Sequence, residues 1–287
     1  MATVISTINL KGGVGKTSTT VAVAEMLGAV FHKKVLVIDL DPQTNITTVL
    51  IGEVKWADLN SKGHTLAQLF KDALADNGQV PKFDLAKTLQ RNVSSVATVV
   101  NVDLLPSSLD LIDIQDRLAT MPRGKYFTRN PVEILRSAIK PIQDEYDYVL
   151  IDCPPNLGLI TLNGLRISSG YIIPTIPDPL STYGIPQILN RVEDFSREIG
   201  ESIPPLGIVI TKFREQARVH HTTMARLRRQ NKPPVFKTVI PENAKMAEAL
   251  DYVHANTMRQ KYGYQGQFDL IQDLTKEIMG VVEAVGV

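Results

Sequence analysis

Eight residues near the start of the chain, Leu10-Lys-Gly-Gly-Val-Gly-Lys-Thr17, have the types and spacing of a phosphate-binding loop. The common form of this loop is G-x-x-x-x-G-K-[ST], and Gly15, Lys16 and Thr17 occupy its last three places. An apolar run precedes the loop and a helix-like segment follows it, in the order that phosphate binding requires. We therefore expect this segment to bind the phosphates of a nucleotide.

The chemistry of the loop follows from its residue types. Glycines tolerate positive φ and carry no side chain, so the backbone can curl around a polyphosphate with its N–H groups pointing inward. The N-terminus of the following helix adds a favourable field for an anion. Lys16 supplies a charge near the β- and γ-phosphates, and Thr17 offers its hydroxyl to Mg²⁺. We expect nucleotide contacts from Gly12, Gly13, Val14, Gly15, Lys16, Thr17 and Ser18.

The loop departs from the common pattern at its start. Leu10 stands where the first glycine is expected, and a second lysine, Lys11, follows it. The charge of Lys11 has no obvious use within one subunit, but it could reach a nucleotide held by a second subunit. The second lysine therefore indicates a dimer assembled around the nucleotide.

Acidic residues follow two other apolar runs. Asp39 and Asp41 come after Val35–Ile38, and Asp152 comes after Tyr148–Ile151. ATPases with a phosphate-binding loop need an acid near Mg²⁺, usually acting through a coordinated water, and Asp152 fits that role. Of the other two, one can orient the attacking water while its neighbour supports the loop or the metal. Thr17, Asp41 and Asp152 are the candidate Mg²⁺ residues, and Asp39 is divided between a supporting role at the metal and a structural one.

Short β-branched runs alternate with helix-like stretches along the chain. Runs without polar alternation are typical of parallel strands that are covered on both faces. The pattern predicts an α/β fold, doubly wound, with a mainly parallel sheet and helices on both faces. The expected strands are Val4–Ile8, Val35–Ile38, Val102–Leu105, Tyr148–Ile151, Tyr171–Ile176, Leu206–Thr211 and Val235–Val239.

We expect residues 1–287 to form a single domain. A less readable, mainly helical insertion with one strand is expected around residues 53–131, and Met121–Asn130 reads as a basic loop within it. Ligands of such folds lie beyond the carboxyl ends of the strands, where the phosphate loop and the acids are expected.

Composition narrows the class of protein. The net charge is +1, so no global field announces a nucleic-acid partner, and the single cysteine, Cys153, excludes an internal disulfide. The single cysteine suits a reducing cytosol, so we expect a cytoplasmic protein. No secretory signal and no stretch of about 20 apolar residues is visible. The residues before Val4 are too few for a helix-turn-helix domain, so sequence-specific operator binding is not expected.

One segment is strongly basic despite the neutral total. Residues Thr211–Lys237 hold eight lysines and arginines against one acid, Glu215. On a helix, one face would carry basic residues while Val219, Thr223 and Leu227 would pack inward. A basic stripe without aromatic residues suits salt-dependent contacts with DNA phosphates rather than base stacking. The candidate DNA-binding residues are Arg214, Arg218, Arg226, Arg228, Arg229 and Lys232.

Three strings together resemble the ParA/MinD family of deviant Walker-type ATPases, in its ParA branch. They are Lys11–Thr17, Asp39-Leu-Asp-Pro-Gln-Thr-Asn45 and Ile151-Asp-Cys-Pro-Pro-Asn-Leu-Gly158, with a weaker match at Ile240–Asn243. The resemblance implies that Lys11 crosses to the partner's nucleotide and that Lys16 and Thr17 serve phosphate and Mg²⁺. It also implies that Asp41 positions the hydrolytic water, that Asp152 is the second acid on the metal side, and that Pro241 and Asn243 lie near adenine.

The resemblance also implies a function. ATP and Mg²⁺ would drive a sandwich homodimer that binds DNA without sequence preference on the nucleoid. A ParB-like or cargo-adaptor partner would stimulate the slow ATP hydrolysis and release the dimer, so that a plasmid or chromosome is segregated. Positioning of a protein cargo, such as carboxysomes, would use the same cycle of ATP-driven dimerisation and DNA binding, and it remains an open alternative.

Three other classes fit the sequence less well. A MinD-like membrane ATPase needs a basic amphipathic C-terminal helix, but the segment Phe268–Val287 is acidic. A nitrogenase-like iron–sulfur protein needs two cysteines in each subunit, and Cys153 stands alone. A small-molecule kinase or ligase needs a second substrate pocket that no motif marks.

Overall fold

The computed structural model describes residues 2–75, 80–120 and 130–286. They contain a seven-stranded sheet with the strand order β3-β2-β4-β1-β5-β6-β7, in which all neighbouring strands are parallel. The α/β, doubly wound fold expected from the sequence is confirmed, and each predicted strand lies within one or two residues of an observed one. The strands are β1 (Thr3–Thr7), β2 (Val35–Asp39), β3 (Val102–Leu105), β4 (Tyr148–Asp152), β5 (Gly170–Thr175), β6 (Pro205–Phe213) and β7 (Val235–Pro241).

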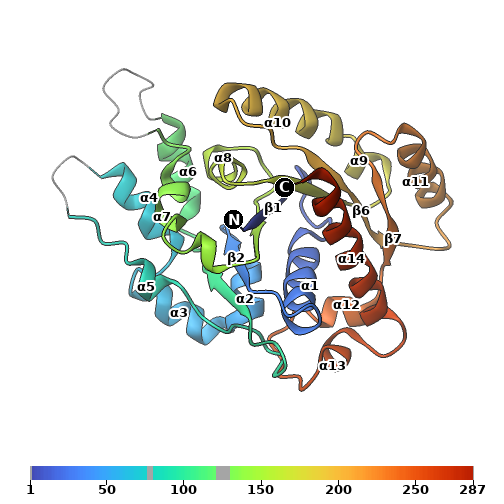
Figure 1. The fold of residues 1–287 in the computed structure, drawn as a ribbon, viewed down its shortest axis with the longest axis horizontal. Coiled ribbons are helices and arrows are strands. Elements are labelled where there is room, and N and C mark those ends of the chain that lie inside the picture. The colour runs from blue at the N-terminus through green and yellow to red at the C-terminus, as the bar shows by residue number, and fades with distance from the viewer. Residues whose placement is uncertain (1, 76–79, 121–129, 287) are drawn as a thin grey trace.

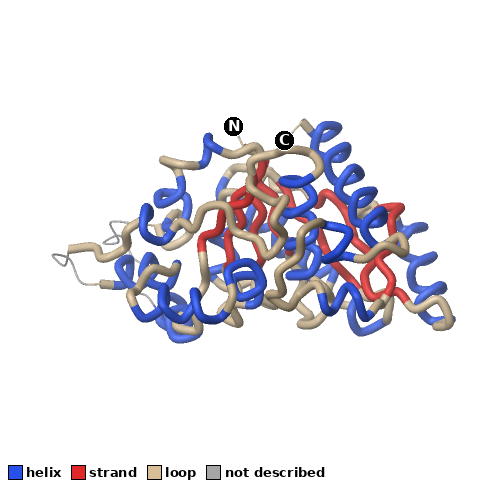
Figure 2. The backbone as a smooth tube through the Cα atoms, turned by 90° about the horizontal axis from the view of Figure 1, so that it is seen from below, coloured by secondary structure: helices blue, strands red, loops and turns tan. Residues whose placement is uncertain are grey.

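Helices enclose the sheet on both sides (Figures 1 and 2). They are α1 (Lys16–Ala29), α2 (Asn45–Ile51), α3 (Glu53–Ser61), α4 (Leu66–Leu74), α5 (Leu85–Thr88), α6 (Leu111–Thr120), α7 (Ile134–Ile139), α8 (Leu159–Arg166), α9 (Pro179–Thr182), α10 (Ile185–Ile199), α11 (Arg218–Gln230), α12 (Ala244–Glu248), α13 (Met258–Tyr262) and α14 (Gln267–Val285).

Successive residues of the buried strands enter two separate cores. Leu36 and Ile38 of β2 pack with residues of α4, α6, α7, α8 and α10, whereas Val35 and Val37 pack with α1, α2, α13 and α14. This division follows from the two-residue period of a strand. It explains why β2 is apolar until Asp39, its last residue, which pairs with Asp152 and places a carboxylate at the edge of the sheet.

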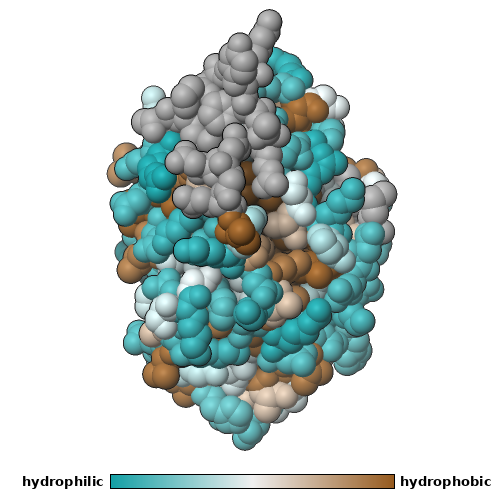
Figure 3. Space-filling model, turned by 90° about the vertical axis from the view of Figure 1, so that its left-hand side faces the viewer, coloured by the Kyte–Doolittle hydropathy of each residue, from teal (hydrophilic) through white to brown (hydrophobic). Residues whose placement is uncertain are grey.

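The region 53–131 contains α3, α4, α5 and α6, with β3 between α5 and α6. The expected strand is thus present, and it joins the sheet as an edge strand beside β2. The face of the molecule on this side is mostly hydrophilic with scattered apolar residues (Figure 3). The basic loop expected at Met121–Asn130 lies outside the described residues, apart from Asn130.

The last helix, α14, packs against the core through one face. Its buried residues are Phe268, Ile271, Leu274, Thr275, Ile278 and Val282. No helix in the described part of the chain combines the length and apolarity needed to cross a bilayer.

A buried ion pair joins α13 to the helix that follows the phosphate loop. Glu25 of α1 is fully buried, and its carboxylate accepts hydrogen bonds from Lys261 Nζ at 2.8 Å, Tyr262 Oη at 2.6 Å and Ser94 Oγ at 2.6 Å. Each buried charge therefore has partners, which is the condition for tolerating it away from water.

Replacing Lys261 by Met should destabilise the protein by about 3–5 kcal/mol, because it leaves the Glu25 carboxylate buried without its counter-charge. The matched control is Lys276→Met, since Lys276 of α14 makes an exposed ion pair with Asp273 and such pairs contribute at most about 1 kcal/mol. Denaturant unfolding of both variants provides the measurement. Equal losses of unfolding free energy in the two variants would show that the buried ion pair stabilises the protein no more than the exposed one.

Candidate nucleotide-binding site

The phosphate loop connects the end of β1 to the start of α1. Gly13 and Gly15 adopt φ values of 74° and 85°, a left-handed conformation that favours glycine, whereas Gly12 does not. Asn9 supports the loop: its Oδ1 accepts from the Lys11 N–H at 2.9 Å, while its Nδ2 donates to the Pro174 carbonyl. The loop is thus held in a curled shape around the N-terminus of α1.

Sheet register brings the predicted acids to the same edge as the loop. Thr7 of β1 pairs with Asp152 of β4, and Asp152 pairs with Asp39 of β2. Thr17 Oγ1 donates to Asp152 Oδ2 at 2.7 Å, and the other oxygen, Oδ1, is buried without a hydrogen-bond partner. A buried carboxylate oxygen without a hydrogen-bond partner, next to a hydroxyl, is suited to contact a Mg²⁺ ion or one of the waters bound to it.

Asp39 and Asp41 have different surroundings. The Asp39 carboxylate is fully buried and accepts from the Asp41 N–H at 3.0 Å, the Thr47 N–H at 3.0 Å and the Thr47 hydroxyl at 2.6 Å. Asp41 lines the same cleft as Lys16 and Thr17. The Asp39 carboxylate thus holds the backbone of the segment that presents Asp41.

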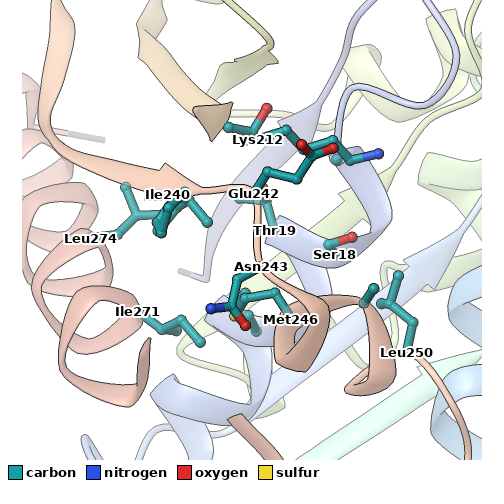
Figure 4. A pocket seen from close by; sticks show the side chains of 15 residues that line it. Ser18, Thr19, Lys212, Ile240, Glu242, Asn243, Met246, Leu250, Ile271 and Leu274 are labelled. Carbon is teal, nitrogen blue, oxygen red and sulfur yellow. The ribbon is translucent and has the colours of Figure 1, made fainter. Parts of the chain in front are cut away.

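Two adjoining cavities extend from the loop. The first, of about 440 Å³, has a mixed lining that includes the charged and hydroxyl side chains of Lys16, Thr17 and Asp41 as well as apolar residues. The second, of about 200 Å³, is mainly apolar and lies between α1, the end of β7, α12 and α14 (Figure 4). Its walls include Ile240, Pro241, Glu242, Asn243, Met246, Ile271 and Leu274. The predicted contacts Pro241 and Asn243 thus lie in one pocket beside the phosphate cleft.

The carboxylates at this edge are perturbed by burial. Burial raises the pKa of Asp152 to about 7, although the Thr17 hydroxyl and the charge of Lys16 oppose the change. Burial, followed by the nearby charge of Asp152, raises the pKa of Asp39 well above its usual value. A bound cation would favour the charged form of Asp152, so metal binding and proton release are expected to be linked.

The raised pKa predicts a pH-dependent stability for the nucleotide-free protein. The folded state favours protonated Asp152. Its contribution to the free energy of unfolding is therefore complete below about pH 4 and is lost as the pH rises from there through about 7. Asp152→Asn cannot ionise, so its stability relative to the wild type should be higher at pH 8 than at pH 5, by about 2 kcal/mol. Unfolding of both proteins without metal or nucleotide tests this, and an equal difference at the two pH values would contradict it.

Lys11 has a partner within its own subunit, which corrects the expectation that its charge has no use there. Its Nζ donates to Ser181 Oγ at 2.9 Å and lies 3.7 Å from Asp178 Oδ2. Asp178 caps the short helix α9, and its Oδ1 accepts from the Ser181 N–H at 2.8 Å. The side chain of Lys11 remains 39% exposed. Lys16, by contrast, is buried and donates to the Lys11 carbonyl at 3.5 Å.

The basic segment forms α11, but its inward face differs from the prediction. His220, Thr223 and Leu227 are buried, whereas Val219 is 44% exposed. His220 replaces Val219 because its Nδ1 accepts from the Arg214 N–H at 3.0 Å and its ring lies against Phe213. Lys232 lies beyond the helix, which ends at Gln230. The expected basic helix is thus present with Thr223 and Leu227 facing inward as predicted, and His220 takes the inward place predicted for Val219.

Several candidate DNA-binding residues contact their own subunit. Arg214 forms a two-pronged ion pair with Glu242. Arg226 donates to Thr182 Oγ1 at 3.2 Å, and Arg228 donates to the Lys237 carbonyl at 3.1 Å. Within the described residues, Arg218, Arg229 and Lys232 are exposed and have no ion pair. The cationic surface is therefore narrower than the sequence suggested.

Other residues of the site carry no sequence signal that a motif captures. Asn9 and Thr211 hold the loop from two sides, since Thr211 Oγ1 donates to the Val14 carbonyl at 2.7 Å. Lys212 adopts a φ of 48° and lines both cavities. Thr211 and Lys212 lie nearly 200 residues after the loop, so only the order of the strands places them there.

Comparison with known proteins agrees with this geometry. A family model described as an AAA domain matches residues 2–204. The sporulation initiation inhibitor protein Soj of Bacillus subtilis is 31% identical over 249 residues, which cover 87% of this chain and 88% of Soj. Among solved structures, an Asp-to-Ala variant of Cyanothece McdA in complex with ATP matches with a TM-score of 0.74 and 23% identity, over 100% of this chain and 97% of that one.

A further structure contains both ligands that the site was predicted to hold. Cobyrinic acid a,c-diamide synthase from Mycobacterium smegmatis, with a bound ATP analog and magnesium, matches with a TM-score of 0.67 and 26% identity, over 85% of this chain and 88% of that one. The family model and the similarity to Soj together assign ATPase activity to the chain. The chain belongs to the ParA/Soj family of partition ATPases.

Proposed function

We propose that the protein is a Mg²⁺·ATP-dependent dimerising switch that binds DNA without sequence preference and segregates or positions a cargo. The observation that carries this proposal is the convergence of Lys16, Thr17, Asp41 and Asp152 on one cleft that continues into an apolar pocket. Residues 1–287 would act as one ATPase domain, with residues 53–131 as an insertion.

Within each subunit, the phosphates would occupy the larger of the two cavities and the base the apolar pocket beside Pro241 and Asn243. Mg²⁺, held on the side of Thr17, Asp41 and Asp152, supplies charge neutralisation at the phosphates when bound. Lys16 positions the terminal phosphates, and the curled backbone of Gly12–Gly15 contributes its N–H groups. Asp41 orients the attacking water, while Asp39 keeps the Asp41 backbone in place.

Dimerisation would occur across the face that carries Lys11. Lys11 is only partly buried, and the neighbouring residues Leu180 and Tyr183 are 79% and 77% exposed. Exposed apolar side chains beside a partly exposed lysine are suited to contact with a second copy of the chain. The partner's nucleotide would then compete with Asp178 and Ser181 for the ammonium of Lys11.

Lys11→Ala should retain ATP binding but lose ATP-dependent dimerisation, because the charge that reaches the partner's phosphates is gone. Sedimentation with and without Mg²⁺·ATP measures the effect, with Lys62→Ala as a control, since Lys62 follows α3 and forms an exposed pair with Asp58. Asp178→Asn separates two explanations, since it removes the counter-charge beside Lys11 without removing the charge of Lys11 itself. Loss of the dimer in Asp178→Asn as well would mean that Lys11 merely holds α9 in place.

DNA would bind to the exposed basic residues of α11. Each subunit of a dimer would present one such surface, and two linked surfaces bind more tightly through their high effective concentration. This supports a cytoplasmic, nucleoid-associated protein whose ATP dimer is the DNA-binding form. A ParB-like or cargo-adaptor protein would stimulate hydrolysis and end each cycle.

Two kinds of cargo are consistent with an ATP-dependent dimer that binds DNA. Segregation of a plasmid or chromosome is the first, because the chain belongs to the ParA/Soj family. Positioning of a protein cargo, such as carboxysomes, is the second, and the fold similarity to McdA over the whole chain favours keeping it. A MinD-like membrane role fits less well, since α14 packs on the core through its apolar face.

The test is binding of the purified protein to random duplex DNA with ATP, ADP or no nucleotide, at two salt concentrations. Tight binding with ATP alone, weakening steeply as salt is raised, is the expected result. Absence of DNA binding in every nucleotide state would overturn the DNA part of the proposal and leave the ATPase without a nucleoid role.

A further inference from the structure

The connection between β6 and α11 lies against the wall of the apolar pocket. Phe213 at the end of β6 is paired with Pro241 at the end of β7, and the Glu242 N–H donates to the Phe213 carbonyl at 2.9 Å. Pro241 also lines the pocket, together with Glu242 and Asn243, which are labelled in Figure 4. The pocket wall and the start of the connection are therefore joined by backbone hydrogen bonds.

Arg214 extends this connection to the helix. Its guanidinium donates through Nε and Nη2 to the two carboxylate oxygens of Glu242, the second at 3.1 Å, and this geometry fixes the orientation of both side chains. The same guanidinium lowers the pKa of the Glu242 carboxyl. The backbone N–H of Arg214 donates to His220, which is buried in the first turn of α11. One residue thus bonds the pocket wall to the helix.

A second contact attaches α11 to the Lys11 side of the nucleotide cleft. Arg226 donates to the hydroxyl of Thr182, and that hydroxyl lies within hydrogen-bond distance of the carbonyls of Asp178 and Pro179 in α9. The turn that receives Arg226 is the one that holds Lys11. The helix is therefore attached at two points to elements of the nucleotide site, and α9 and α11 lie near each other at one end of the molecule (Figure 1).

We propose that the Arg214–Glu242 pair couples occupancy of the apolar pocket to the DNA-binding state of α11. This inference rests on the proposed function. A base in the pocket would order Pro241–Asn243, and the pair would pass that order to the first turn of α11, where Arg218 is exposed. Because coupling between two ligands is reciprocal, DNA on α11 would tighten nucleotide binding by the same factor.

Arg214 is then a positioning residue for α11 and not a contact to DNA. Its charge is already matched by Glu242, so it adds little to the cationic surface. Removing Arg214 should therefore leave the salt dependence of DNA binding almost unchanged. A phosphate contact behaves differently, because its loss weakens binding in every state and makes the salt dependence shallower.

The experiment compares wild type, Arg214→Gln, Glu242→Gln and the exchange variant Arg214→Glu with Glu242→Arg. The control is Arg259→Gln, which breaks an ion pair of similar exposure with Asp269 at the start of α14. DNA affinity is measured with and without ATP. In the wild type, ATP should raise it by a factor within the usual range of about 5 to 150. In either Gln variant this factor should fall to near one, and the exchange variant should recover it.

Two results would overturn the inference while leaving the proposed function intact. An unchanged ATP effect in Arg214→Gln would make the pair an ordinary surface ion pair. A uniform loss of DNA affinity with a shallower salt dependence would make Arg214 a phosphate contact. Thermal unfolding of each variant checks that the fold is retained, and Glu242→Gln provides a second route if Arg214→Gln folds poorly.

Amide hydrogen exchange tests the coupling without DNA. Mg²⁺·ATP should slow exchange in α11 of the wild type, and this slowing should be absent from Arg214→Gln and present in Arg259→Gln. If the wild type binds no DNA in any state, the proposed function fails but this measurement still applies. An α11 that does not respond to nucleotide, or that responds equally in Arg214→Gln, would overturn the inference.

Discussion

Replacing Asp41 by Ala is expected to lower ATP turnover by about 100-fold or more, which corresponds to roughly 2.7 kcal/mol of transition-state stabilisation. Asp41 lines the phosphate cleft, and its backbone is fixed by Asp39, so its carboxylate can hold a water in a defined place. Nucleotide binding should persist, because Lys16, Thr17 and the loop backbone are untouched. The variant should accumulate as an ATP-bound dimer.

Asp41→Ala should also change how long the protein stays on DNA. A dimer that cannot hydrolyse ATP should stay on DNA, so its dissociation in ATP should be slow compared with that of the wild type. Phosphate release and the DNA off-rate are the two measurements, with Asp58→Ala on α3 as a control acid in an exposed ion pair. Rapid dissociation of Asp41→Ala in ATP would count against its role in hydrolysis.

The second prediction concerns the cationic face of α11. Arg218 and Arg229 are eleven positions apart, which places them on the same side of the helix. Reversing both charges, with Arg218→Glu and Arg229→Glu, should reduce DNA affinity by at least about 100-fold, since each lost phosphate contact removes nearly one released counterion. The reduction follows because a dimer would lose two contacts from each subunit and gain repulsion.

The matched control applies the same change in charge to a neighbouring helix. Arg191→Glu with Arg197→Glu alters two exposed arginines of α10 and preserves the net charge of the test variant. Affinity and its dependence on salt are measured with Mg²⁺·ATP present, and dimerisation is measured separately. If both double variants lose affinity equally, DNA responds to net charge alone and the surface has been misassigned.

The two predictions separate the two halves of the switch. Asp41→Ala acts on hydrolysis and should lengthen the DNA-bound state, whereas the α11 variant should dimerise and hydrolyse ATP without holding DNA. The opposite signs on DNA retention make a general folding defect an inadequate explanation for both.

Much of the fold and of the phosphate site could be predicted from local sequence. The apolar runs that predict β1, β2 and β4 also place the phosphate loop, Asp39 and Asp152 at strand ends. Since parallel strands end at the same edge of the sheet, those segments had to converge once the strands were adjacent. The pairing of Thr7 with Asp152 is the observed form of that expectation.

The surroundings of single side chains were less predictable. On α11, the helical period identified the correct pair Thr223 and Leu227 but chose Val219 over His220 as the inward residue. Hydropathy favours valine, whereas the buried histidine is stabilised by the Arg214 N–H and the Phe213 ring. A polar residue can thus be buried where tertiary contacts satisfy it, and no periodicity reports those contacts.

The sequence by itself determined the strands, the curled phosphate loop and the acids at the strand ends, because each depends on residues within a few positions of one another. Only the tertiary structure decided the partners of the charged residues. Lys11 meets Asp178, Arg214 meets Glu242 and Glu25 meets Lys261 across separations of 28 to 236 residues. Such pairs form when the order of strands in the sheet brings distant segments together, so local sequence carries no sign of them.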